Sequence, residues 1–125
     1  MLDFAPATND RSVADTVLDD EIFCAACGRS ITRERWRIER RGAHEHTVFN
    51  PSGKLFTIQC FIEAPGVTPI GQASSEFTWF AGHRWTVSAC IGCAVHIGWR
   101  FEADDIFFGL IKPRLAIYRQ DRRAP

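Results

Sequence analysis

The chain has 125 residues, of which 46% are hydrophobic and 24% charged, and its formal net charge is zero. This length suits a single domain with one core, and the zero net charge excludes a general attraction to nucleic acid or to anionic membranes. No apolar run approaches the roughly 20 residues that span a bilayer and no signal peptide is visible, so we expect a cytoplasmic protein.

Residues 1–20 are polar and aperiodic, which predicts a disordered N-terminal tail. We expect a folded domain over 21–118 and a short C-terminal tail over 119–125. The sequence Asn50-Pro51-Ser52-Gly53 is a strong turn signal. It precedes an alternating segment over 55–62, which predicts a strand with one face made of Phe56, Ile58, Cys60 and Ile62.

Further along the chain, Pro65-Gly66 and Pro69 to Gly71 predict a loop. Long helical periodicity is absent. Short strands are expected over 77–80, 85–89, 98–101 and 107–111. The predicted class is therefore all-β.

Four of the five cysteines form two Cys-x-x-Cys pairs, Cys24 with Cys27 and Cys90 with Cys93. Two intervening residues allow both sulfurs of a pair to reach one tetrahedral ion at about 2.3 Å. In an intracellular protein, such pairs favour a metal over disulfides. The sequence therefore predicts one structural Zn²⁺ per chain, enclosed by four thiolates with no open position for catalysis.

Other potential ligands are interpreted differently. His96 could replace one sulfur, but we interpret it as a packing or orienting residue. His44 and His46 could form a second metal site, but a hydrogen-bonded strand end explains them more simply. Cys60 follows an apolar strand pattern, which predicts a small buried hydrophobic residue.

Three tryptophans, Trp79, Trp85 and Trp99, lie within 21 residues and flank the second cysteine pair. Their spacing matches no single helix face, but neighbouring β-segments could bring them together. Three indole faces meeting at one point would form a box for a small flat or cationic ligand. The alternative is that all three are ordinary core residues.

These motifs together resemble the thalidomide-binding (CULT) domain of the cereblon family, in particular its bacterial single-domain homologues. The resemblance covers roughly residues 22–117. It rests on both cysteine pairs and on three segments, His44 to Gly53, Glu76 to Phe80 with Trp85, and Cys90 to Phe101 followed by Phe107 to Ile111.

The resemblance implies two antiparallel sheets that meet at an angle (a β-tent), pinned by the four-cysteine zinc site. It implies a non-enzymatic domain in which Trp79, Trp85 and Trp99 form a ligand cage and Phe101 closes its base. The backbone at Phe77 and Trp79, beside Thr78, would hydrogen-bond the imide edge. Asn50, next to Pro51, would form the rim.

The implied ligands are cyclic imides: glutarimide and succinimide groups, thalidomide-type drugs, C-terminal cyclic imides on peptides, and uracil-like rings. Nucleic acid, membrane and ubiquitin-ligase docking are not expected of this chain. Phe101 replaces a tyrosine found in some bacterial relatives, which removes one hydroxyl from the cage floor.

Three alternatives remain from the residues themselves. An aromatic cage for a quaternary ammonium or methyl-lysine suits three tryptophans equally well. A methionine-R-sulfoxide reductase would need a nucleophilic cysteine, and no cysteine follows Cys93. The arginine-rich segment 29–41 could contact nucleic acid, but such runs usually form solvated faces.

Overall fold

The computed structural model describes residues 20–117, so the predicted tails lie outside the described residues, apart from Asp20. Asp20 forms ion pairs with Arg33 at 2.9 Å and with Arg35 at 2.7 Å.

None of the helices in the described part is long or apolar enough to cross a membrane. The elements, in chain order, are β1 (Glu21–Cys24), β2 (Ser30–Arg33), η1 (Glu34–Trp36), β3 (Glu45–Phe49), β4 (Leu55–Phe61), β5 (Val67–Ser74), β6 (Arg84–Cys90), β7 (His96–Glu102), β8 (Ile106–Ile111), η2 (Lys112–Arg114) and β9 (Leu115–Ala116).

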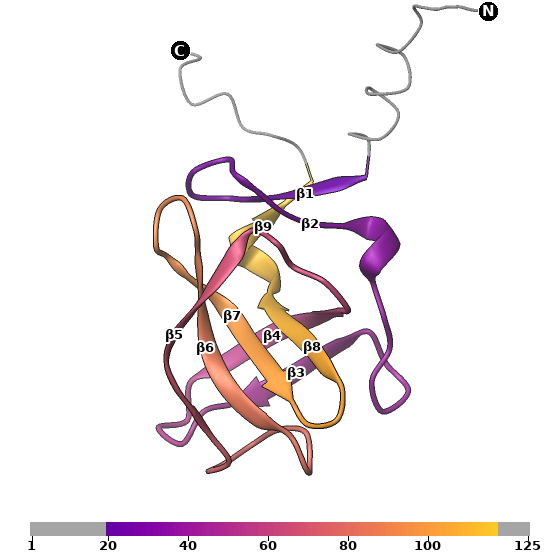
Figure 1. Cartoon of the computed structure of the whole chain (residues 1–125), viewed down its shortest axis with the longest axis vertical. Coiled ribbons are helices and arrows are strands. Elements are labelled where there is room, and N and C mark those ends of the chain that lie inside the picture. Colours follow the sequence, from indigo (N-terminus) through magenta and orange to yellow (C-terminus); the bar gives the residue numbers. More distant parts are fainter. Residues whose placement is uncertain (1–19, 118–125) are drawn as a thin grey trace, which may run out of the picture.

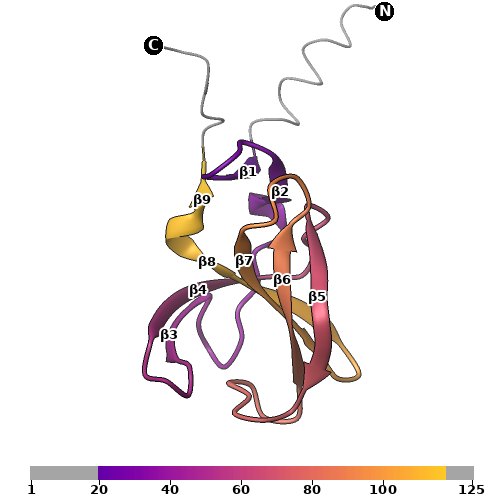
Figure 2. The ribbon, with the colours of Figure 1, turned by 90° about the vertical axis from the view of Figure 1, so that its left-hand side faces the viewer.

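The strands form two antiparallel sheets, which confirms the predicted class (Figure 1). The small sheet has the order β2-β1-β9, and the large sheet has the order β3-β4-β8-β7-β6-β5. Figure 2 shows that β3 and β4 diverge from β5, β6 and β7 below the small sheet. The large sheet therefore has two wings, one made of β3 and β4 and the other of β5, β6 and β7.

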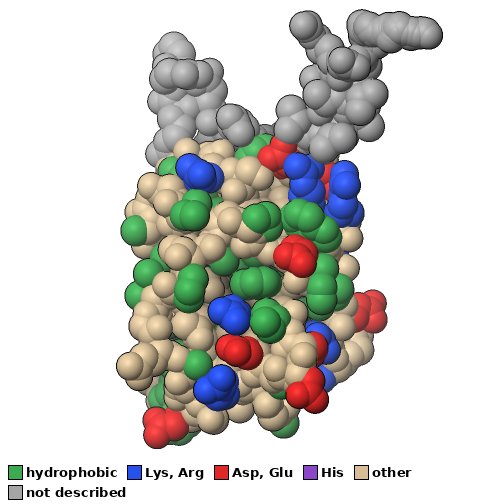
Figure 3. All heavy atoms as spheres, viewed as in Figure 1, with side chains coloured by type: hydrophobic (Ala, Val, Ile, Leu, Met, Phe, Trp, Pro, Cys, Tyr) green, Lys and Arg blue, Asp and Glu red, His purple; other side chains and the backbone are tan. Residues whose placement is uncertain are grey.

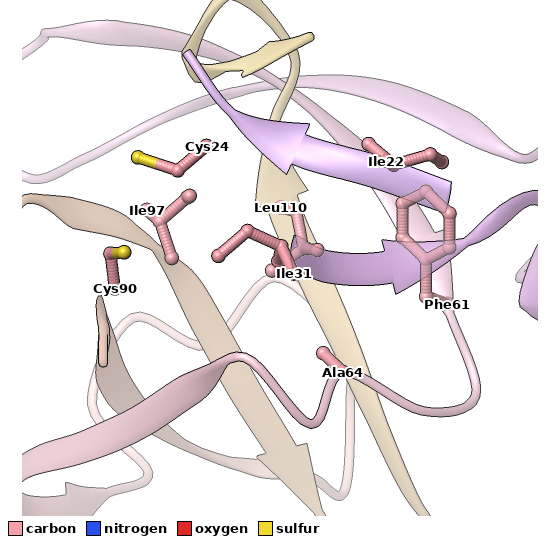
Figure 4. Packing of buried hydrophobic residues seen from close by; sticks show 8 residues of the cluster. All are labelled: Ile22, Cys24, Ile31, Phe61, Ala64, Cys90, Ile97 and Leu110. Carbon is pink, nitrogen blue, oxygen red and sulfur yellow. The ribbon is translucent and has the colours of Figure 1, made fainter. Parts of the chain in front are cut away.

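Two hydrophobic clusters pack on opposite faces of the large sheet, because side chains alternate along its strands. Along β8, Phe107 and Ile111 join one cluster, while Phe108 and Leu110 join the other. The first cluster lies under the small sheet and includes Ile22 and Ile31 (Figure 4). The second cluster fills the angle between the wings, where it contains Trp99 and Phe101.

The outer surface is mixed in character. Figure 3 shows hydrophobic side chains interspersed with cationic and anionic ones on the face seen in Figure 1. Glu102 on β7 lies 3.7 Å from Arg84 on β6 and 3.6 Å from Arg100 on its own strand. These pairs lie at the surface and contribute little to stability, in the range of about 0–1 kcal/mol each.

The strand predicted over 55–62 is confirmed as β4, with Phe56, Ile58 and Cys60 buried on one face. The prediction that Ile62 shares this face is wrong. Phe61, at the end of β4, is fully buried in the cluster under the small sheet, and Ile62 is 39% exposed. The alternation ends with the strand, so Ile62 no longer shares the face of Cys60.

Two predictions between residues 65 and 80 are wrong. The loop predicted over 69–71 belongs to β5, where Pro69 pairs with Ser88. Proline is tolerated there because β5 is an edge strand and needs no donor on its outer side. Residues 75–83 form a loop instead of the strand expected over 77–80, and Phe77 has a left-handed φ of 57°, which interrupts extended backbone.

The close approach of β7 and β8 depends on Gly98. A Cβ atom at this position would lie 2.3 Å from the carbonyl oxygen of Gly109 and 2.9 Å from the Cα of Leu110. Both obstructing atoms belong to backbone, so the clash cannot be relieved by a side-chain rotation. We therefore expect Gly98→Ala to lower the free energy of unfolding by about 3 kcal/mol, measured by urea denaturation.

Gly42→Ala is the matched control, because Gly42 faces open space and has a φ of +82°. Its cost should be limited to the left-handed conformation, about 1 kcal/mol. An equal or smaller loss for Gly98→Ala than for Gly42→Ala would show that the two strands are not packed this closely.

Candidate functional site

The two Cys-x-x-Cys turns share one backbone geometry. In the first, the Gly28 N–H donates to the Cys24 carbonyl at 2.8 Å, and in the second the Ala94 N–H donates to the Cys90 carbonyl at 2.8 Å. Gly28 and Ala94 each lie four residues after the first cysteine of their pair, and both have positive φ, 80° and 68°. The tight turn at Gly28 therefore recurs at Ala94, where a non-glycine residue adopts the same conformation.

The four cysteine sulfurs come together in one cluster, with all Sγ atoms within 4.8 Å of one another. Cys24 Sγ lies 3.8 Å from Cys93 Sγ, and Cys27 Sγ lies 3.6 Å from Cys90 Sγ. None of these cysteines is in a disulfide. A tetrahedral ion with metal–sulfur bonds of about 2.3 Å would place its sulfurs about 3.8 Å apart. The cluster therefore fits a tetrahedral metal ion.

The cluster lies where the two sheets meet. Cys24 is the last residue of β1 in the small sheet, and Cys90 is the last residue of β6 in the large sheet. Burial raises the pKa of the Cys24 thiol to about 12, so a cation is needed to hold it as a thiolate at neutral pH. A bound ion would join the two sheets covalently through their side chains.

The remaining cysteine and the histidines lie outside this cluster. Cys60 is fully buried in β4, and burial raises the pKa of its thiol to about 11. His44 Nδ1 lies 3.0 Å from the Ile38 carbonyl oxygen, and His46 Nε2 lies 3.0 Å from that of Ala43. These contacts match the hydrogen-bonded interpretation of the two histidines.

An aromatic pocket of about 410 Å³ opens between the two wings of the large sheet. This size is within the roughly 300–1,000 Å³ typical of small-molecule sites. Its walls come from the β3–β4 turn and β4, from the loop over 75–83, and from β6 and β7. The lining residues are Asn50, Pro51, Lys54, Phe56, Phe77, Trp79, Trp85, Val87, His96 and Trp99.

The three tryptophans contribute to this pocket in different ways. The Trp79 and Trp99 rings meet edge to face, with centroids 4.7 Å apart and an interplanar angle of 83°. Phe56 packs edge to face against Trp99 at 5.0 Å. Trp85 makes no comparable ring contact with the aromatic residues described in 20–117. Its indole therefore stacks on neither of the other two, although all three line the pocket.

Backbone acceptors hold two of the indoles in place. The Trp79 Nε1–H donates to the Phe49 carbonyl at the end of β3, at 2.7 Å. The Trp85 Nε1–H donates to the Glu76 carbonyl, also at 2.7 Å. Because both indole N–H groups are satisfied, these side chains offer the pocket mainly their apolar faces.

The loop over 75–83 is anchored beyond its tryptophan. The Phe80 ring is buried and lies edge to face against Phe101 at 4.8 Å. His83 Nε2 lies 2.8 Å from a carboxylate oxygen of Asp105, which also pairs with Arg40. The hydrogen bonds from His83 and Arg40 lower the pKa of Asp105, so this carboxyl stays charged at neutral pH.

The loop also presents an available donor and acceptor. The described contacts of residues 20–117 include no hydrogen-bond partner for the Phe77 carbonyl or for the Trp79 backbone N–H. Phe77 is 70% exposed, and its left-handed backbone sets the direction of the peptide groups that follow. Both groups are therefore left without a protein partner within residues 20–117.

The structure brings six of the eight predicted ligand residues to this pocket, namely Asn50, Pro51, Phe77, Trp79, Trp85 and Trp99. Thr78 is not among the lining residues, and its hydroxyl donates to the Phe80 carbonyl at 3.2 Å. Phe101 is fully buried under the pocket, with its ring centroid 6.3 Å from that of Trp79. Phe101 thus supports the pocket from beneath and does not line it.

Sequence reasoning missed four lining residues, Lys54, Phe56, Val87 and His96. Val87 was open to prediction, because it lies two residues after Trp85 on the same strand face. His96 donates from Nε2 to the Gly98 carbonyl at 3.0 Å and packs edge to face on Trp99 at 4.6 Å. Burial lowers the pKa of His96 below its usual value, which keeps the ring neutral at pH 7.

A second hollow of about 720 Å³ lies beside the cysteine pairs, but it is more open. Its lining includes Cys27, Arg29, Pro65 and Gly92, and it contains no aromatic side chain. An open, polar depression lacks the buried apolar walls that hold small molecules. We therefore place the candidate ligand site in the aromatic pocket.

The arginine-rich segment 29–41 is largely engaged with its own chain. Arg33 and Arg35 pair with Asp20, Arg37 pairs with Glu34, and Arg40 pairs with Asp105. The Arg41 guanidinium lies 5.3 Å from the Phe80 ring centroid. Most of these cations are therefore neutralised or packed, which gives no support to the nucleic-acid alternative.

Comparison with known proteins adds independent information. No family profile matches the chain. Cereblon from Drosophila virilis is 27% identical over 125 residues, covering 90% of this chain and 19% of that protein. Cereblon from Drosophila grimshawi is 39% identical over 61 residues, and cereblon from Danio rerio is 35% identical over 54 residues. These two matches cover 44% and 43% of this chain.

The fold and the site define an all-β domain with an aromatic pocket and with four clustered cysteines that could hold a metal ion. The similarity to cereblon over 90% of the chain supports a cereblon-like (CULT) domain. The chain spans about a fifth of the length of the curated relatives that it matches over this range.

We expect the cluster to bind one metal ion per chain and to be required for folding. Replacing one ligand, as in Cys24→Ser, should release the ion and unfold the domain, because such sites contribute on the order of 10 kcal/mol. The metal-to-protein ratio by elemental analysis and the thermal unfolding curve by circular dichroism would measure both effects.

Cys60→Ser is the matched control, since it makes the same change at a buried thiol outside the cluster. It should retain the ion, whatever it costs in core packing. A Cys24→Ser protein with unchanged metal content and melting temperature would exclude the structural role of the cluster.

Proposed function

We propose that this cereblon-like domain captures cyclic imides without catalysing a reaction, in a cage formed by Trp79, Trp85 and Trp99. The ligands are glutarimide and succinimide groups, including C-terminal cyclic imides on peptides, thalidomide-type drugs and uracil-like rings. The observation that carries the proposal is an indole-walled pocket beside a backbone donor at Trp79 and a backbone acceptor at Phe77, neither of which has a partner among residues 20–117.

The shape and polarity of the pocket suit a small flat ring. Aromatic faces carry negative potential, which attracts the polarised C–H groups of an imide ring. Trp85 stacks on neither Trp79 nor Trp99 and all three line the pocket, so a ring can lie against their faces. Burial of the ring against three indoles would supply most of the affinity.

The edge of the ring needs matched partners, because each unpaired polar group in a dry pocket costs about 1–3 kcal/mol. An imide presents a carbonyl, an N–H and a second carbonyl in a row. In our proposal the Trp79 N–H donates to one ring carbonyl and the Phe77 carbonyl accepts the ring N–H. Recognition through backbone leaves the Phe77 and Thr78 side chains free to vary without loss of binding.

For the cluster, we propose Zn²⁺ as the resident ion. Four thiolates in tetrahedral positions are the usual structural zinc set. A closed shell of four sulfurs leaves no position for water, so the ion would hold the fold together and take no part in ligand binding.

The rival cage for a quaternary ammonium is less well supported. A cationic guest is favoured by negative charge at the rim, in addition to aromatic faces. Among the lining residues of this pocket there is a lysine, Lys54, and no carboxylate. The reductase alternative lacks its nucleophile, because Cys60 is buried and its thiol has a raised pKa.

The proposal predicts that glutarimide, thalidomide and uracil change the tryptophan fluorescence, with affinities in roughly the micromolar range. Trp36→Phe is a useful background, since Trp36 packs against the cluster under the small sheet and contributes unrelated emission. In that background, Trp85→Ala should abolish imide binding. Trp99→Ala is a poorer test of binding, because Trp99 is 6% exposed and its truncation would cost about 3–5 kcal/mol of stability.

The metal content and melting temperature of Trp85→Ala serve as controls for folding. Competition with a trimethylammonium ligand would separate the two kinds of cage. If all three imide-type compounds leave the fluorescence unchanged while a trimethylammonium compound alters it, the imide proposal is wrong and the cation cage is correct.

A further inference from the structure

Lys54 gives the aromatic pocket a positive rim. It is the one fully charged side chain among the described lining residues, since burial keeps His96 neutral at pH 7. The Lys54 ammonium lies 5.4 Å from the centroid of the Phe56 ring. Phe56 in turn packs on Trp99, so the charge stands next to the aromatic wall.

No described residue neutralises the Lys54 charge. Within residues 20–117, no carboxylate oxygen lies within 4.0 Å of its ammonium, whereas Lys112 Nζ lies 3.2 Å from Glu45. The Lys54 backbone is fixed, because its N–H donates to Asn50 Oδ1 at 2.8 Å and its carbonyl accepts from the Asn50 N–H at 2.9 Å. The side chain therefore extends from a rigid turn.

Asn50 adds further donors to the same rim. Its side-chain oxygen accepts from the Ser52 N–H at 3.1 Å and from the Ser52 hydroxyl at 2.8 Å, as well as from Lys54. Backbone N–H groups can only donate, so this atom must be the oxygen. The amide nitrogen then remains to donate outward. The Asn50 side-chain oxygen is thus already occupied. Asn50 and Lys54 offer a ligand only hydrogen-bond donors from their side chains.

We propose that the pocket selects cyclic imides whose substituent carries a carboxylate, which Lys54 and the Asn50 amide bind at the rim. This inference rests on the proposed function, since the imide ring occupies the indole-walled part of the pocket. The substituent leaves the ring past the β3–β4 turn, where it meets the Lys54 ammonium and the Asn50 amide. Lys54 is the specificity-determining residue, and the backbone at Phe77 and Trp79 recognises the ring itself.

The expected preference is modest, because Lys54 is exposed and exposed ion pairs are weak. We expect a carboxylate to improve affinity by about three- to five-fold at low salt. Screening should reduce this advantage when ionic strength rises from about 0.05 M to about 0.5 M. Binding of a neutral imide should change little over the same range.

Two probes of equal size test the inference. One is 3-aminoglutarimide acylated with succinate, which ends in a carboxylate, and the other is its succinamide counterpart, which ends in a neutral amide. Dissociation constants from fluorescence titration should favour the carboxylate probe for the unaltered chain. Lys54→Gln should remove the preference, so that the two probes bind with equal affinity.

Lys112→Gln is the matched control, because Lys112 is paired with Glu45 and is not among the lining residues. It should keep the full preference. Equal affinities of the two probes for the unaltered chain, or a preference that survives Lys54→Gln, would overturn this inference and leave imide capture intact. Failure of both probes to bind would instead remove the proposed function on which it rests.

Discussion

The arrangement of the molecule depends on the convergence of four cysteine sulfurs at the ends of β1 and β6. The small sheet has only three short strands and cannot form a core alone, so it gains stability from the large sheet beneath it. A metal ion at the cluster would fix both sheets at one point. Because β6 starts beside Trp85 and ends at Cys90, the same strand links the cluster to the aromatic pocket.

The pocket itself is built from segments with different rigidity. Trp99 and Val87 lie on paired strands, whereas Trp79 lies on the irregular loop over 75–83. That loop is held by the Phe80 ring, by the His83 contact with Asp105 and by the indole hydrogen bond to Phe49. Irregular backbone has unused N–H and C=O groups, which a paired strand lacks. Because the loop over 75–83 is not part of a strand, some of its backbone N–H and C=O groups remain available to a ligand.

The sequence could predict what depends on residue type and spacing. The cysteine pairs, the strand of Phe56 to Cys60 and the grouping of the tryptophans all follow from short-range patterns. The sequence could not predict the loop over 75–83, because its Phe-Thr-Trp-Phe segment has a high strand propensity. Only tertiary contacts override that propensity. The edge position that tolerates Pro69 and the burial of Phe101 beneath the pocket also depend on the assembled sheet.

The charge at the rim bears on the nature of the guest. Indole faces alone attract positive charge, and they do not distinguish an ammonium from the polarised C–H groups of a neutral ring. Lys54 changes this balance, because a cation entering the pocket would approach another cation with no carboxylate among the lining residues to offset the repulsion. A neutral imide avoids this cost, and an imide with a carboxylate on its substituent turns the same charge into an attraction. The lysine therefore argues for a neutral ring at the indoles and for negative charge outside them.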